Sequence, residues 1–360
     1  MKEKKYLDDI DIAKAIGIIL VVIGHCIPGK ITNFIYLFHM PMFFMITGYV
    51  FKPEENWNGY IAFIKRKIKS LYIPFVMFNI LFLVLNNLFI DIGFLEVGYN
   101  NCVRIESPVQ FAKELIKIIL LVRMMEICKA LWFVRVMFVS IIIYCGLRVV
   151  FKKNYINYAI FLLCLIGGYV VAGFEFLADA LSQNIILVML GIAFIALGGL
   201  YRVIRSKINL KKHTNIVAVI VSFIILYIFN ENGAHINMVL LELSNPVFIT
   251  LTTLLGTFIV FESSIWLTNT IIKQFLCYIG KNTMPILGLH YVAFKIVNVI
   301  YAIKLGIHSI LKNTSIYTSP LNGVLNVTIG VIFPLMLYEL YKLCENQTGK
   351  NRNLRYEYKQ

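Results

Sequence analysis

Charged residues are scarce in this sequence: Asp, Glu, Lys and Arg together make up 15% of its 360 residues. Hydrophobic residues make up 59%, well above the roughly 45–50% that is usual in soluble domains. The longest connection between apolar runs covers roughly residues 91–129, which leaves no room for a separate soluble domain. The composition therefore excludes a soluble globular protein and predicts an integral membrane protein.

Cysteine spacings typical of metal sites are missing as well. The seven cysteines contain no C-x2-C pair, so we expect no bound metal. A disulfide framework is not expected either; Cys102 and Cys128 are the one pair that could form a bridge. There is no internal repeat and no Gly-rich phosphate loop. No cleavable leader is visible, so the first apolar run is expected to be a retained span.

Ten apolar runs approach the length of about 20 residues that a helix needs to cross a bilayer. They cover residues 10–29, 31–51, 70–90, 130–149, 155–173, 184–203, 214–230, 247–267, 284–303 and 322–343. Pro, Gly and Asn border several of them, as is usual at helix ends. We expect an all-α integral membrane protein with about ten transmembrane helices.

The net charge of +15 is explained by the way the protein is expected to cross the membrane. Lys and Arg gather in alternate connections, most clearly in residues 1–9, 52–69 and 202–213. This alternation is the positive-inside pattern and predicts that both termini are cytoplasmic. Nucleic acid is therefore not an expected partner. Residues 1–345 are expected to form a single transmembrane domain, followed by a short basic cytoplasmic tail, 346–360, without regular structure.

The connection at 91–129 contains a predicted helix of its own. Ser107 and Pro108 are typical of an N-cap and first helical position. Gln110, Glu114 and Lys117 then follow at helical spacing, with Lys113 beside them. This pattern predicts an amphipathic helix on the outer membrane surface. Such a helix either ties the loop down, the favoured interpretation, or acts as a lid over an active site.

Two histidines in neighbouring spans are the strongest functional signal. His25 follows Lys14 by eleven residues, which puts both side chains on one helix face about 16 Å apart. Asp11 can pair with Lys14, which either joins a site or snorkels to the interface. His39 lies in the next span. Ionisable residues in apolar spans indicate function, and a neutral imidazole can act as a general base towards a hydroxyl.

Sequence motifs at these positions resemble those of a known family. Asp11-x-x-Lys14, with His25 eleven residues later, precedes Phe38-His-Met-Pro-Met-Phe-Phe-Met-Ile-Thr-Gly-Tyr49. Together they look like the opening of the acyltransferase family 3 membrane proteins. Further likeness lies in residues 63–74, 131–133, 279–283 and 289–290. The departures are conservative, namely Lys14 and Lys69 for the commoner Arg and Thr47 for Ser.

The resemblance implies a function. An acyl group, usually acetyl from cytoplasmic acetyl-CoA, would pass to a hydroxyl of a cell-surface glycan or its lipid-linked or saccharide precursor. His25 would be the catalytic histidine, with Lys14 as its basic partner and His39 beside it. Arg66 and Lys69 would form the inner basic pair that binds the donor. Acetyl-CoA would be a co-substrate with no bound cofactor, and the protein would be multi-pass in a bacterial inner or plasma membrane.

Other residues are candidates for the cavity or for acceptor binding. They are Asp11, Tyr49, Trp132, Arg135 and His290. Arg135 would either bind the acceptor or snorkel outward. For Lys295 and Glu262, pairing between helices is the preferred interpretation.

Two alternatives remain open at this stage. A secondary transporter or flippase for a sugar or other polar metabolite would suit ten spans with buried charges, although no repeated halves are visible. A sensor or scaffold would not need two histidines in adjacent helices. Because relatives often carry an extracytoplasmic domain, this chain is expected to act alone or with a separate acetyl-delivery protein.

Overall fold

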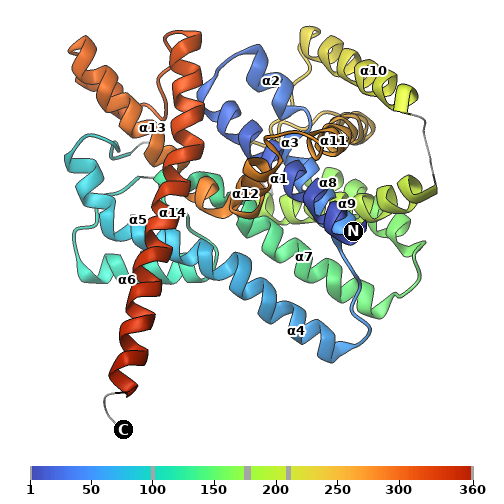
Figure 1. Ribbon diagram of the computed structural model, residues 1–360, viewed down its shortest axis with the longest axis horizontal. Helices are drawn as coiled ribbons and strands as arrows, with labels where there is room; N and C mark the ends of the chain where they lie inside the picture. Colours follow the sequence, from blue (N-terminus) through green and yellow to red (C-terminus); the bar gives the residue numbers. More distant parts are fainter. Residues whose placement is uncertain (1, 99–101, 174–179, 208–211, 358–360) are drawn as a thin grey trace.

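The fold is entirely helical in the part of the chain that the computed structural model describes, residues 2–98, 102–173, 180–207 and 212–357. Apart from one isolated antiparallel bridge between Asn237 and Glu242, these residues contain no β structure. Eight helical segments are long and apolar enough to cross a membrane. The prediction of an all-α integral membrane protein is thereby confirmed (Figure 1).

The helices follow one another in this order: α1 (Lys2–Cys26), α2 (Lys30–Tyr36), α3 (His39–Val50), α4 (Trp57–Lys67), the π-helical turn η1 (Ile68–Tyr72), α5 (Ile73–Asp91), α6 (Pro108–Ile119), the 3-10 turn η3 (Glu126–Leu131), α7 (Trp132–Val150), α8 (Ile156–Ala172), α9 (Ala180–Lys207), α10 (Lys212–Glu231), α11 (Pro246–Leu267), α12 (Lys273–Lys281), α13 (Thr283–Leu305), the 3-10 turn η5 (His308–Lys312) and α14 (Pro320–Glu357).

The eight candidate spans coincide with eight of the ten predicted runs. The predicted runs 10–29 and 155–173 fall on α1 and α8. Helix α1 carries Asp9, Asp11 and Lys14 in its first half, and α8 has only 17 residues. The structure thus supports eight spans by length and composition.

The predicted span 31–51 is not one helix. It is divided into α2 and α3 by a break at Leu37 and Phe38, where Phe38 leaves the helical region with φ −147°. The Phe38 ring lies against Gly256 of α11, where a Cβ atom would be 2.1 Å from the ring. The break sets His39 at the start of α3, buried and close to the end of α1.

The helix that contains the third predicted run, 70–90, begins before that run. Helix α4, the turn η1 and α5 form one continuous helical segment from Trp57 to Asp91. Pro74 lacks an N–H group and its ring would clash with the carbonyl of Ser70 in a regular helix. The wider π turn directly before Pro74 accommodates it without ending the helix.

Helix α1 is at the centre of the bundle and contacts α2, α3, α11, α12, α13 and α14. Its approach to α12 is close enough to require glycine, because a Cβ atom on Gly280 would lie 1.7 Å from the Asp11 carbonyl oxygen. At the same end, Lys273 Nζ lies 2.7 Å from Asp8 Oδ2. The hydrogen bond to Asp8 raises the pKa of Lys273 above its usual value.

The amphipathic helix is confirmed as α6, with the Ser107 hydroxyl accepting from the Gln110 N–H at 3.2 Å. Its polar stripe differs from the prediction, because Glu114 is buried and pairs with Lys117 at 2.6 Å and Arg123 at 3.1 Å. Tyr72 donates to the Ile119 carbonyl at 2.8 Å. These contacts tie the connection to α5, in agreement with the favoured interpretation.

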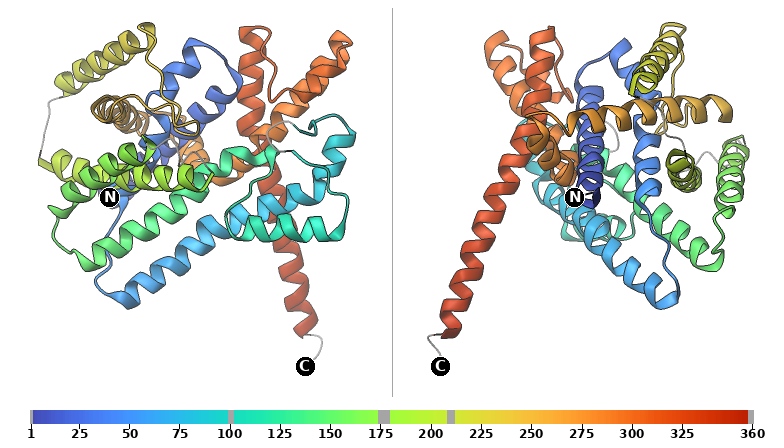
Figure 2. Two further views of the ribbon diagram at one scale, coloured as in Figure 1. Left: turned by 180° about the vertical axis from the view of Figure 1, so that it is seen from behind. Right: turned by 45° about the vertical axis from the view of Figure 1, so that its right-hand side comes forward.

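Two further expectations are corrected. All seven cysteines are free, so Cys102 and Cys128 do not form a bridge; the Cys128 thiol instead contacts Asn79 Oδ1 at 3.4 Å. Helix α14 continues to Glu357 and includes most of the basic tail expected to lack regular structure. Its C-terminal part extends away from the other helices (Figure 2).

Replacement of Gly280 by valine tests the packing of α1 on α12. The added side chain meets backbone rather than a flexible side chain, so the helices must separate. We expect a loss of at least about 1–3 kcal/mol, typical of overpacking, and a clearly lower melting temperature of the purified protein. Ala62→Val, on the exposed face of α4, is the control. Equal melting temperatures for the two variants would contradict the close approach.

Candidate active site

His25, the penultimate residue of α1, meets α13. Its Nδ1 atom lies 3.1 Å from the hydroxyl of Tyr291. Its ring stacks on that of His290, with 5.4 Å between centroids and 22° between planes. The predicted candidates His25 and His290 are therefore in one site. Tyr291 was not predicted as a site residue from the sequence. Its position directly after His290 in an apolar span was the feature that could have indicated it.

His290 is buried and carries one unsatisfied nitrogen. Its Nδ1 lies 2.9 Å from the carbonyl oxygen of Ile286. A carbonyl can only accept, so Nδ1 carries the proton and Nε2 is an acceptor. That Nε2 atom has no hydrogen-bond partner among the described residues. Buried polar atoms normally have partners, so a donor from a substrate would complete this site.

His39 approaches the same site from α3. Its Nδ1 donates to the Ile35 carbonyl at 3.0 Å, and its ring stacks on Tyr36 with centroids 4.9 Å apart. Tyr36 in turn packs against α1 at Gly24, where a Cβ atom would be only 2.9 Å from the tyrosine ring. His39 and His290 are both close enough to His25 to interact with it electrostatically.

A cavity of about 190 Å³ runs along the His25-bearing face of α1. We call it the Lys14 cavity. From α1 it is lined by Lys14, Ile18 and Val21, and Val21 lies one turn before His25. Its other walls come from α3, η1, α7 and α13 and are mostly apolar. The cavity thus joins a cationic end, at Lys14, to the neighbourhood of His25.

Lys14 and Asp11 form the predicted pair, with 2.7 Å between Lys14 Nζ and Asp11 Oδ1. Lys281 of α12 lies 3.9 Å from the other carboxylate oxygen. The Lys14 side chain is 33% exposed, so its ammonium group reaches solvent while its stem borders the cavity. It can therefore both snorkel and contribute charge to the cavity entrance.

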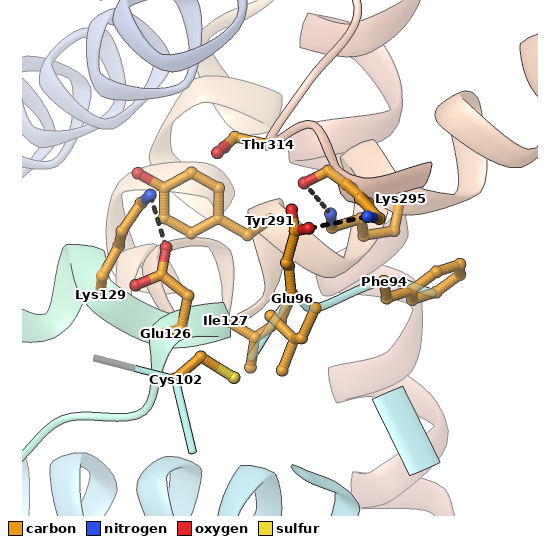
Figure 3. A pocket seen from close by; sticks show the side chains of 11 residues that line it. Phe94, Glu96, Cys102, Glu126, Ile127, Lys129, Tyr291, Lys295 and Thr314 are labelled. Atoms are coloured by element: carbon orange, nitrogen blue, oxygen red, sulfur yellow. Dashed lines mark hydrogen bonds and ion pairs between the residues drawn. The ribbon is translucent and has the colours of Figure 1, made fainter. Parts of the chain in front are cut away.

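Beyond Tyr291 there is a second, smaller opening of about 30 Å³, shown in Figure 3, which we call the Tyr291 vestibule. Lys129 of η3 lies over the Tyr291 ring at 5.4 Å and pairs with Glu126 at 2.8 Å. Lys312 pairs with Glu96 at 2.8 Å across the vestibule. Its charged lining contrasts with the mostly apolar Lys14 cavity, and Tyr291, which lines the vestibule, contacts His25.

Lys295 lines this vestibule and binds the chain segment beside it. Its ammonium group donates to the carbonyls of Leu311, Lys312 and Asn313 at 2.8–3.2 Å. The expectation of helix pairing is wrong for Lys295, because its partners belong to the connection between α13 and α14. Ser315 of this connection donates to the carbonyl of His25 at 3.0 Å.

Arg66 and Lys69 precede Leu71 in the helical segment formed by α4 and η1. Arg66 pairs with Glu54 at 2.5 Å, and Lys69 is an exposed residue of the π turn η1. Two residues after Lys69, Leu71 lines the Lys14 cavity. The basic segment and the cavity are therefore joined through this turn.

Three predicted cavity residues lie elsewhere. Tyr49 packs on Phe261, with ring centroids 4.7 Å apart. Trp132 is buried, and its neighbour Phe133 rather than Trp132 lines the Lys14 cavity. Arg135 donates to the Leu121 carbonyl at 3.2 Å and borders a different groove.

Glu262 pairs with Arg205 of α9 at 2.6 Å and accepts from Asn215 of α10 at 3.2 Å. The expected helix pairing is confirmed for this residue.

Comparison with known protein families indicates the class of reaction. Residues 7–339, nearly the whole chain, match the family described as "Acyltransferase domain". The chain belongs to acyltransferase family 3. It is therefore a membrane acyltransferase, and the match extends from α1 to α14. No curated protein and no solved structure matches the chain.

If this acyltransferase uses the Lys14 cavity, filling it should stop the reaction. Val21→Phe inserts a ring between Lys14 and His25, and we expect acyl transfer to fall at least about tenfold, since positioning dominates such steps. The control is Leu20→Phe, which adds the same ring outside the cavity lining. Acyl transfer from acyl-CoA by purified protein is the measurement. Equal rates for both variants would contradict the role of the cavity.

Proposed function

We propose that this protein transfers an acetyl group from cytoplasmic acetyl-CoA to a hydroxyl of a cell-surface glycan or its lipid-linked or saccharide precursor, in a bacterial plasma membrane. The observation that carries the proposal is the contact of His25, one turn beyond Val21 of the Lys14 cavity, with Tyr291 of the vestibule. A donor entering by one and an acceptor entering by the other would meet at its imidazole.

The distribution of charge supports this orientation. Thr47, Leu71 and Thr283 line the Lys14 cavity, and each lies beside or just after a segment with the positive-inside pattern. The vestibule is lined by residues from the connections after α5 and α13, which lie on the other side in the same scheme. The Lys14 cavity would then open to the cytoplasm, where acetyl-CoA is made available, and both termini would be cytoplasmic.

Donor binding would use the basic segment before α5. The phosphates of CoA would bind Arg66 and Lys69, with Arg66 exchanging its present partner Glu54 for a phosphate. The apolar lining of the Lys14 cavity suits the pantetheine arm. Lys14 would stay paired with Asp11 at the entrance. The thioester would then lie near His25.

His25 would act as the general base. In this role His25 Nδ1–H would donate to the Tyr291 oxygen, 3.1 Å away, which leaves the lone pair of Nε2 for the substrate. It would take the proton of the acceptor hydroxyl as that oxygen attacks the thioester carbonyl. The C–S bond then breaks, and the imidazolium returns the proton to the CoA thiolate. His290 Nε2, buried beside His25, would accept a hydrogen bond from a second donor of the acceptor.

The proposal is tested by mass spectrometry of surface glycans from cells that carry the wild-type gene, the His25→Ala variant or no gene. We expect a mass increase of one acetyl group only in wild-type cells. The control is that the wild-type and His25→Ala proteins are present in the membrane at equal levels. Acetylated glycan in the His25→Ala cells would refute the role of His25.

Tyr291→Phe tests the contact that orients His25. The ring and its packing remain, and only the hydroxyl is lost. We expect kcat to fall about tenfold or more, a fraction of the effect of a general base, with the KM for acetyl-CoA unchanged. Tyr278→Phe, which removes a hydroxyl bonded to Glu339 on α14, should leave kcat unaltered. An unchanged kcat in Tyr291→Phe would show that the contact has no part in the reaction.

A further inference from the structure

A second, larger space lies on the other side of α7. It is a groove of about 490 Å³ between α7 and α9, roofed at one end by the residues that follow α6. We call it the Arg135 groove. It shares no lining residue with the Lys14 cavity or the Tyr291 vestibule. Neither the proposed reaction nor the family match assigns it a role.

One end of this groove is polar. Arg135 is the fourth residue of α7 and Asn184 lies in the second turn of α9, so both are close to the ends of their helices. Among the described residues, the Arg135 guanidinium group donates to the carbonyl of Leu121, and its buried Nε atom has no hydrogen-bond partner. Leu121 adopts φ 61°, rare for a side chain of this kind.

Arg135 has no acidic partner in the described part of the chain. Each ion pair found there joins other residues. Glu114 on the adjoining α6 is already engaged by Lys117 and Arg123. A cation in an apolar span is costly unless a counter-ion compensates it. Among the described residues this charge has no counter-ion, and an anion bound in the groove would supply one.

The rest of the groove is an apolar trough. Helices α7 and α9 run side by side in the same direction, as the Ser140 hydroxyl donates to the Val188 carbonyl at 3.1 Å. The trough is lined by Val139 and Ile143 on α7 and by Val188 and Ile192 on α9. From Arg135 to Ile143 it extends for eight residues, or about 12 Å. One cationic end and one long apolar trough match one lipid molecule.

We propose that the Arg135 groove is a binding site for an anionic membrane lipid, with its phosphate on Arg135 and Asn184 and an acyl chain along the trough. Charge complementarity selects the occupant. A neutral lipid would leave the arginine uncompensated, and a free phosphate would leave the trough empty. Basic pockets between transmembrane helices are known to bind lipid phosphates. The site is independent of the proposed acyl transfer, so either can fail without the other.

The experiment uses full-length protein in phosphatidylcholine nanodiscs. Photoactivatable phosphatidylglycerol and phosphatidylcholine with identical chains are added separately, and labelled peptides are identified by mass spectrometry. We expect the anionic probe to label peptides containing residues 135–143 and 184–192 about tenfold more than the zwitterionic probe, as an added charged contact predicts. Excess inorganic phosphate should not compete.

Two variants test the contact with the lipid headgroup and the contact with the acyl chain separately. Arg135→Gln should bring labelling by the two probes to the same level, and Val139→Trp, which fills the trough but keeps Arg135, should abolish labelling by both. Lys113→Gln and Val84→Trp are matched controls for charge and for bulk at exposed positions and should behave as wild type. Equal labelling by both probes in the wild type, full competition by phosphate, or undiminished selectivity in Arg135→Gln would overturn the proposal.

Discussion

The contact between His25 and Tyr291 is the constraint on which the rest of the site depends. It joins the end of the central helix α1 to α13, 266 residues later in the chain. Tyr291 lines the charged Tyr291 vestibule, and Val21 of the apolar Lys14 cavity lies one turn before His25, whose ring also stacks on His290. Under the proposed function, an imidazole in this position would serve a donor and an acceptor that enter from different sides.

The fold brings these groups together by close backbone packing. Helix α1 must approach α12 at Gly280, and α3 must approach α9 at Gly48, where a Cβ atom would lie 1.8 Å from the Ile195 carbonyl oxygen. In lipid, where apolar burial does not favour one helix pair over another, such small residues allow tight association. The break at Phe38 then turns His39 and Tyr36 towards α1. His25 is thus held by packing rather than by charge.

Much of this could be predicted from the sequence, for physical reasons. The pairing of Asp11 with Lys14, the Ser107 cap and the helical class follow from local spacing and hydropathy. Contacts between distant segments could not be predicted in this way. Hydropathy does not reveal the division of α2 from α3, because Leu37 and Phe38 are apolar, and it does not distinguish the π turn before Pro74 from a regular helix. Tyr291 and the loop contacts of Lys295 depend on which helices meet, which periodicity cannot supply.

The central claim is that a donor reaches His25 through the Lys14 cavity. A structure of the protein with a non-hydrolysable acetyl-CoA analogue tests it most directly. The account predicts the pantetheine arm beside Ile18 and Val21, the phosphates near Arg66 and Lys69, and the carbonyl carbon within reach of an acceptor oxygen held by His25, about 3–3.5 Å from that oxygen. Analogue bound elsewhere, with the Lys14 cavity unoccupied, would contradict it.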